Sequence, residues 1–116
     1  MITGIEVLKF GVEDRQEANT FLADFGLKAV DSDIDGTDLY QTQNGSKIYL
    51  FDIADARLPE AIEAGSTLRE VTWGVGNQKD FEKLKADLAN EPGFVSSASH
   101  VQCRDPNGMT IVFEKS

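Results

Sequence analysis

Two short segments repeat one pattern and divide the chain into two similar units. Phe10-Gly11-Val12 and Trp73-Gly74-Val75 each close a run in which apolar residues alternate with others. Two residues later stands Asp14 in the first copy and Asn77 in the second, and both residue types favour the start of a helix. Alternation gives each strand one apolar face, expected to carry helices, and one mixed face. The mixed faces of the two strands are therefore expected to line a cavity.

The first unit, residues 1–55, is expected to form one strand, one helix and three further strands. Asp14, with Glu17 three residues later, predicts the start of the helix. Gly26 predicts its end, because glycine readily adopts the left-handed conformation that closes helices. Asn44-Gly45 predicts a hairpin between the last two strands. The expected strands cover residues 2–12, 27–30, 39–43 and 47–53.

The second unit, residues 67–116, repeats this order after a linker at residues 56–66. In the linker, Pro59 predicts a short helical turn that continues through Ile62. Asp105-Pro106-Asn107-Gly108 predicts a type I turn before the closing strand. The expected strands cover residues 67–75, 94–98, 100–103 and 109–114.

The composition limits the partners of this chain. Twenty acidic and eleven basic residues leave a net charge of −9, which repels phosphate backbones and anionic membrane surfaces. We therefore expect no nucleic acid and no membrane partner. Cys103 is the single cysteine, so an internal disulfide is excluded. The sequence has neither a signal pattern at its start nor a long apolar run, which predicts a cytoplasmic protein.

Two motifs connect the doubled unit to a known superfamily. Phe10-Gly11-Val12-Glu13-Asp14 leads into the first helix, and Asp105-Pro106-Asn107-Gly108-Met109 leads into the last strand. On these motifs the chain resembles the vicinal oxygen chelate superfamily, which includes glyoxalases, extradiol dioxygenases and bleomycin-resistance proteins. Residues 58–65, followed by residues 67–71, also look like the linker and fifth strand in the N-terminal half of two-part, dioxygenase-like members.

The resemblance implies a fold and an assembly. The expected fold is α+β, with two βαβββ modules that curl one mixed sheet around a central cleft and carry their helices outside. Residues 1–116 would form a single glyoxalase/dioxygenase-like domain. Cupped sheets of this superfamily commonly pair edge to edge or exchange modules, so we expect a homodimer. In two-part members the catalytic metal usually belongs to the other, C-terminal half.

The resemblance also implies where a metal would bind. In the superfamily a divalent cation sits in the cup on ligands from four strand positions, which fall here on Val7, Glu70, Val112 and near Tyr49. Valine has no lone pair to donate, so we predict no metal cofactor at this position. A divalent metal held by Glu70 and Glu114 is the alternative.

Side chains on the mixed faces are the candidates for binding a small organic ligand. Lys9 and Glu70 either form a buried ion pair in place of the metal or are two separate solvated charges at an open mouth. Tyr49 and Phe51 share a strand face and can hold a planar or apolar ligand. The candidate ligand-binding residues are Lys9, Tyr49, Phe51, Glu70, Thr72 and Glu114.

Two hypotheses for the function follow. The first is a domain without the usual metal chelate that binds a small organic ligand or forms the non-catalytic half of a dioxygenase-like assembly. The second is a metal-dependent dioxygenase or lyase whose site includes Glu70 and Glu114. No catalytic residue is assigned, because His100 has no partner that the sequence identifies and Cys103 is interpreted as a small buried hydrophobe.

Overall fold

The computed structural model describes residues 2–115 and places eight strands and two helices in them. The strands are β1 (Ile2–Val12), β2 (Lys28–Val30), β3 (Asp38–Gln41), β4 (Lys47–Asp52), β5 (Thr67–Val75), β6 (Val95–Ser96), β7 (His100–Arg104) and β8 (Thr110–Lys115). The helices are α1 (Arg15–Asp24) and α2 (Gln78–Leu88). Both units therefore have the expected order of elements, although β6 is shorter than the strand predicted at residues 94–98.

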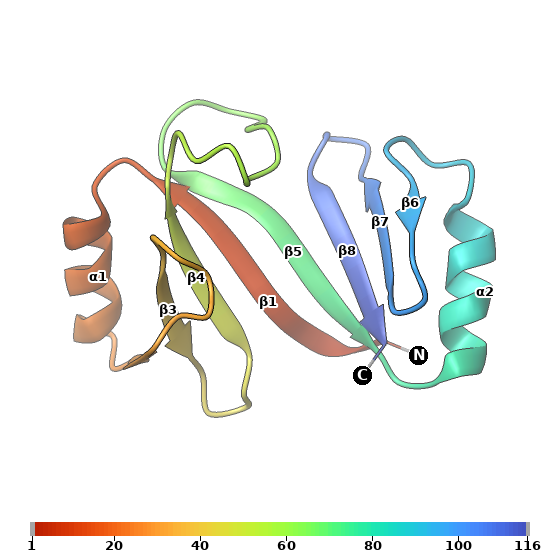
Figure 1. The fold of residues 1–116 in the computed structure, drawn as a ribbon, viewed down its shortest axis with the longest axis horizontal. Helices are drawn as coiled ribbons and strands as arrows, with labels where there is room; N and C mark the ends of the chain where they lie inside the picture. The colour runs from red at the N-terminus through yellow and green to blue at the C-terminus, as the bar shows by residue number, and fades with distance from the viewer. Residues whose placement is uncertain (1, 116) are drawn as a thin grey trace.

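All eight strands form one mixed sheet in the order β2-β3-β4-β1-β5-β8-β7-β6. At its centre β1 pairs antiparallel with β5, which places Lys9 opposite Glu70. β1 also pairs parallel with β4, and β5 pairs parallel with β8, so the two units are arranged alike on either side of the centre. Figure 1 shows α1 and α2 at opposite ends of this sheet. The predicted α+β fold is confirmed.

Both helices begin at the predicted caps. The side chain of Asp14 accepts a hydrogen bond from the backbone N–H of Glu17 at 3.0 Å, and that of Asn77 accepts one from Asp80 at 2.8 Å. α1 then contacts β4, and α2 contacts β8. Within residues 2–115, neither helix is long and apolar enough to cross a membrane.

The face of the sheet that carries the helices holds an apolar cluster beneath each helix. In the first unit, Ala18 and Leu22 of α1 pack against buried Tyr40 and Leu50. In the second unit, Phe81 of α2 is fully buried. The cluster around it consists of Val75, Val101, Leu84, Leu88, Phe94 and Phe113. Helical spacing of apolar residues predicts a buried face on each helix. In the first unit Ala18 and Leu22 follow this prediction, whereas Phe21 and Phe25, which have the same spacing, are 59% and 71% exposed.

We call the face of the sheet opposite the helices the inner face. In the first unit, Ile34 from the loop between β2 and β3 and Leu58 from residues 53–66 cover this face and pack around Tyr49 and Phe51. The phenol of Tyr49 also donates a hydrogen bond to Asp33 in the same loop. Two loops therefore fill the inner face of the first unit, whereas that of the second unit borders two cavities.

Residues 53–66 contain no helix, so the helical turn predicted at residues 59–62 was wrong. The guanidinium of Arg69, which is 8% exposed, donates to the carbonyl of Pro59 at 2.7 Å and to that of Ile53 at 2.9 Å. These bonds tie the segment to β5 at two points. Because the Pro59 carbonyl is engaged by a side chain distant in sequence, tertiary contacts override the local preference of proline to begin a helix.

Candidate functional site in the second unit

Lys9 and Glu70 form an ion pair on the inner face at the centre of the sheet. The ammonium nitrogen of Lys9 lies 3.2 Å from Oε2 of Glu70, across the antiparallel pairing of β1 and β5. The Lys9 side chain is 27% exposed and that of Glu70 is 13% exposed. Of the two arrangements that the sequence left open, the paired one is present. Water still reaches the pair, so it is half-buried rather than sealed in the core.

The residues at the positions where the resemblance would place a metal do not fit a divalent cation. Val7 packs against the apolar cluster of the first unit, and Val112 is 8% exposed. Burial, together with the hydrogen bond to Asp33, raises the pKa of Tyr49 to about 12, so its phenol stays protonated and committed to Asp33. Glu70 is left as a single carboxylate, and it is already paired with Lys9. Divalent cations need several oxygen or nitrogen ligands.

Glu70 and Glu114 do not converge on one point. Glu70 pairs with Thr110 on β8. Glu114 lies four residues further along the same strand, so the backbone positions of Thr110 and Glu114 are about 13 Å apart. Within residues 2–115 no group of three or more His, Cys, Asp or Glu side chains is arranged to hold a metal ion. The alternative site built on these two carboxylates therefore lacks the geometry to share one cation.

Glu114 instead lies beside His100, a contact that sequence reasoning missed. The pairing of β7 with β8 places the two residues opposite each other, with Nε2 of His100 3.7 Å from Oε1 of Glu114. Nδ1 of His100 is 2.9 Å from the hydroxyl of Ser99. The imidazole is 50% exposed and the carboxylate 39% exposed, so this pair lies at the rim of the inner face.

Three other predicted ligand-binding residues are buried. Tyr49 is 4% exposed, Phe51 is 2% exposed and Thr72 is 5% exposed. The two rings lie against each other, with their centres 6.3 Å apart, inside the cluster that Leu58 closes. The two rings are part of the hydrophobic core on the inner face of the first unit. They could contact a ligand only if the loops that carry Ile34 and Leu58 moved away.

Two adjoining cavities open on the inner face of the second unit, and we call them together the inner cleft. The larger has a volume of about 740 Å³ and the smaller about 280 Å³, and both are bordered by Glu70 and Gln102. The lining of the larger is mainly polar. It includes Arg57, Glu60, Arg104 and Thr110, while Lys9, Ser96, Ser97, His100 and Val112 line the smaller.

The residues of β7 that border the inner cleft were missed from the sequence, although a signal for them was present. His100, Gln102 and Arg104 are exposed, whereas Val101 and Cys103 between them are buried. This is strict alternation, which identifies the polar positions as one face of a strand. Cys103 is a buried hydrophobe as predicted, and burial raises the pKa of its thiol.

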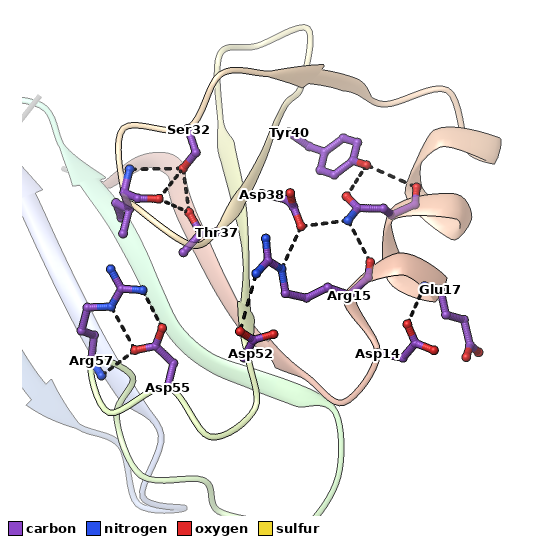
Figure 2. Close-up of polar contacts among 12 residues, drawn as sticks. Asp14, Arg15, Glu17, Ser32, Thr37, Asp38, Tyr40, Asp52, Asp55 and Arg57 are labelled. Atoms are coloured by element: carbon purple, nitrogen blue, oxygen red, sulfur yellow. Dashed lines mark hydrogen bonds and ion pairs between the residues drawn. The ribbon is translucent and has the colours of Figure 1, made fainter.

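Arg57 at one wall of the cleft is held by Asp55 (Figure 2). Nε and Nη2 of the guanidinium contact the two carboxylate oxygens at 3.0 and 2.6 Å. This forked hydrogen bond lowers the pKa of Asp55 to about 2. The Arg57 guanidinium also lies 5.3 Å from the centre of the Phe51 ring. Arg57 is therefore a fixed wall of the cleft whose charge is already balanced.

The fold is shared with several solved enzymes. The chain is similar to a catechol 2,3-dioxygenase with a TM-score of 0.74 and 19% identity, over 99% of this chain and 40% of that one. It is similar to a methylmalonyl-CoA epimerase from Mycobacterium tuberculosis with a TM-score of 0.64 and 15% identity, over 98% and 88% of the two chains. For the Mn(II)-bound glyoxalase from Novosphingobium aromaticivorans the TM-score is 0.68 and the identity 17%, over 98% and 39%.

The likeness rests on three-dimensional structure. No family model matches the sequence, and no curated protein matches it. The chain spans about 40% of the length of the catechol 2,3-dioxygenase and 39% of the glyoxalase, whereas it spans most of the epimerase. Dioxygenases, glyoxalases and epimerases of this kind share one architecture, and the order and pairing of the strands described above agree with it. The chain has the fold of the vicinal oxygen chelate superfamily.

Proposed function

We propose that this chain binds a small organic acid in the inner cleft, with no metal chelate at the centre of the sheet. The observation that carries the proposal is the guanidinium of Arg104, which borders the larger cavity. Among residues 2–115, no carboxylate lies within ion-pair distance of it, whereas Lys9 and Arg57 are paired with Glu70 and Asp55. An unpaired guanidinium in a polar cleft is suited to bind a carboxylate.

The chemistry of the other lining groups narrows the class of ligand. A guanidinium presents its N–H groups in a fork that matches the two oxygens of a carboxylate. Glu60 and Glu70 lie at the same cavity and accept hydrogen bonds, so they favour ligand hydroxyl groups over a second carboxylate near them. Gln102 can both donate and accept. A hydroxy acid satisfies these groups better than an apolar or a purely anionic molecule does.

The test is an NMR titration of isotope-labelled protein with lactate, a hydroxy acid with one carboxylate, and with its uncharged amide, lactamide. Lactate should shift the backbone signals of Gln102, Arg104 and Thr110 in a saturable way, and lactamide should bind more weakly. Arg104→Met should weaken lactate binding by about tenfold, because a hydrogen-bonded charge contact is lost. Lys79→Met, at an exposed position on α2, is the matched control and should leave the affinity unchanged.

Two outcomes count against the proposal. Lactate and lactamide have nearly the same size and differ in charge, so equal affinities would show that no carboxylate is recognised. Lactate-induced shifts that persist unchanged in Arg104→Met would place the binding elsewhere. The folded state of each variant is checked by its thermal unfolding curve before the titration.

A second function is favoured by the length of the matched enzymes. The chain spans about 40% of a catechol 2,3-dioxygenase and has a TM-score of 0.74 with it. This supports the proposal that the chain is the structural, non-catalytic part of a dioxygenase-like assembly. A separately encoded second part that carries a complete metal site would then form a stable complex with this chain on co-expression. Failure of such a pair to co-sediment would exclude this role.

A further inference from the structure

A further cavity lies on the other face of the sheet, between α1 and strand β1. Its volume is about 580 Å³, and it is separate from the inner cleft because Leu8, Phe10 and Val12 project to the face opposite Lys9. Apolar side chains form its floor and one wall. They are Leu8, Phe10, Val12, Ile48 and Leu50 of the sheet with Ala18, Phe21 and Leu22 of the helix.

Polar contacts hold α1 toward β3 and thereby leave this groove open (Figure 2). Nε of Arg15 donates to Oδ2 of Asp38 at 3.0 Å, and Asn19 donates to the same oxygen at 2.8 Å. The phenol of Tyr40 donates to the side-chain oxygen of Asn19 at 2.6 Å. Arg15 and Asn19 lie on one side of α1. Phe21 is rotated away from both of them about the helix axis, by roughly a quarter turn or more. The groove is therefore preformed by the anchoring of the helix.

The helix wall of the groove is apolar and exposed to water. Phe21 is 59% exposed and Phe25 is 71% exposed, with their rings edge to face at 4.7 Å between centres. No residue of α1 is fully buried. Covering such rings with an apolar molecule is favourable because it removes apolar surface from water. The groove thus offers binding energy to a ligand with an apolar body.

The rim of the groove determines which charge that ligand carries. Glu13, Asp14 and Glu17 are the charged residues that line it, and the lining includes no Lys, Arg or His. Asp14 is engaged as the cap of α1. No hydrogen-bond or ion-pair partner of the Glu13 or Glu17 carboxylate is found within residues 2–115. Two available carboxylates at the mouth of an apolar groove attract a cation and repel an anion.

We propose that this groove binds a cationic amphiphile, with its apolar chain on Leu8, Phe10 and Phe21 and its ammonium group between Glu13 and Glu17. The charge of the rim selects this ligand over an anionic amphiphile of the same length. The chain's net charge of −9 adds to the same preference. The proposal does not depend on the ligand of the inner cleft, because the two sites lie on opposite faces of the sheet.

The test compares octyltrimethylammonium, octyl glucoside and octyl sulfate, each titrated below its micelle concentration and followed by NMR. The cationic probe should shift the signals of Phe10, Glu17 and Phe21 and should bind about fivefold or more tightly than octyl sulfate at low salt. Added salt should reduce this difference, because exposed charges are screened. Lactate should leave these signals unchanged.

Three variants separate the contributions of the wall and the rim. Phe21→Ala should weaken binding of all three probes, while Phe25→Ala, which removes a more exposed ring outside the lining, should have a smaller effect. Glu13→Gln combined with Glu17→Gln should remove most of the preference for the cation and keep the affinity for octyl glucoside. Glu91→Gln in the second unit is the matched control for loss of a carboxylate.

Several results would overturn the proposal. Equal affinity for the cationic and anionic probes would remove the role of the rim. Binding that Phe21→Ala does not weaken would place the ligand elsewhere. Sedimentation equilibrium tests whether a second copy of this chain occupies the groove instead. A wild-type dimer that Phe21→Ala converts to a monomer would show that it does.

Discussion

The ammonium nitrogen of Lys9 lies 3.2 Å from the carboxylate of Glu70, on paired positions of the two central strands. The resemblance would place a metal cation at this level of the sheet, and here Lys9 supplies the positive charge opposite the carboxylate of Glu70. The pair borders the smaller cavity of the inner cleft. It therefore sets the charge at the floor of the proposed ligand site as well as stabilising the contact between the two units.

Replacing Lys9 should destabilise the protein by a moderate amount. Lys9→Met leaves the Glu70 side chain, which is 13% exposed, without its partner. Removing one member of a fully buried pair costs about 3–5 kcal/mol, and exposed pairs contribute about 1 kcal/mol or less. For this half-buried pair we expect a loss of about 1–2 kcal/mol in the free energy of unfolding, measured by urea denaturation.

A double-mutant cycle isolates the interaction between the two side chains. Lys9→Met and Glu70→Gln should each destabilise, and the double variant should lose less than the sum of the two. Lys83→Met serves as the control, because the Lys83–Asp87 pair has side-chain exposures of 76% and 58%. Strict additivity at Lys9 and Glu70 would contradict a stabilising ion pair.

Asp38 should make the stability of the first unit dependent on acid pH. Burial raises the pKa of this carboxyl, but the hydrogen bonds from Arg15 and Asn19 outweigh it and hold the pKa below its ordinary value of 3.8. Because the folded carboxyl binds a proton less readily than the unfolded one, its stabilisation is present above pH 3.8. It is lost as the pH falls through the lower folded pKa.

The measurement compares urea unfolding of the wild-type protein and Asp38→Asn over a range of acid pH. The wild type should be more stable near neutral pH, and the difference should shrink as the pH falls below about 3.8, near the ordinary pKa of aspartate. Asp24→Asn, an exposed position in the last turn of α1, should show a much smaller difference at every pH. A difference that stays constant down to the lowest pH would show that Asp38 acts through packing rather than charge.

Arg69 should control how residues 53–66 are held against the sheet. Its guanidinium joins the carbonyls of Ile53 and Pro59, and Arg69→Leu leaves both of these acceptors without that donor. We expect a loss of about 1–3 kcal/mol in the free energy of unfolding. Limited proteolysis should show faster cleavage within residues 53–66. Arg104→Leu, at an exposed position, should change neither quantity, and normal protease resistance of Arg69→Leu would contradict the role.

The two helix caps should contribute about equally. Asp14→Ala and Asn77→Ala each remove the acceptor of a first-turn amide, which typically lowers stability by about 1 kcal/mol. Chemical denaturation of the two variants measures this. Replacement by Ser at either position keeps an acceptor and should recover most of the loss, whereas a full loss in the Ser variants would show that the cap bond is not the cause.

The parts of this structure that depend on local pattern could be predicted from the sequence. Asp14 and Asn77 mark their helices by residue type, and alternation along β1 and β5 places Lys9 and Glu70 on one face. Their contact follows from the doubled unit, because pairing of the two central strands brings these positions together.

The parts that depend on loops could not be predicted. Tyr49 and the ring of Phe51 were expected to face an open cleft, and they are covered because Leu58 and Ile34 reach over them. The position of Leu58 depends on bonds from distant Arg69, which no local pattern encodes. The alternation of polar and apolar residues in β7 did indicate which residues face the cleft. Because the strand has only five residues, this alternation was not recognised from the sequence.

Introducing the ligands that the resemblance implies should create a metal site at the centre of the sheet. Val7 pairs with Thr72, and Thr72 pairs with Val112, so the two valines lie on one row of the inner face, about 10 Å apart. Val7→His and Val112→Glu place two donors that can reach inward over Thr72 toward the carboxylate of Glu70.

Lys9→Met must accompany these changes, because the ammonium group would otherwise compete with a cation for Glu70. Calorimetric titration with Mn²⁺, Ni²⁺ and Zn²⁺ should show one-to-one binding to the triple variant and weak binding to the wild-type chain. The single variant Lys9→Met is the control, since it frees Glu70 without adding donors. Tight one-to-one binding by the wild-type protein would mean that its ligands lie at other positions, and it would move the metal-dependent enzyme ahead of the metal-free binding site.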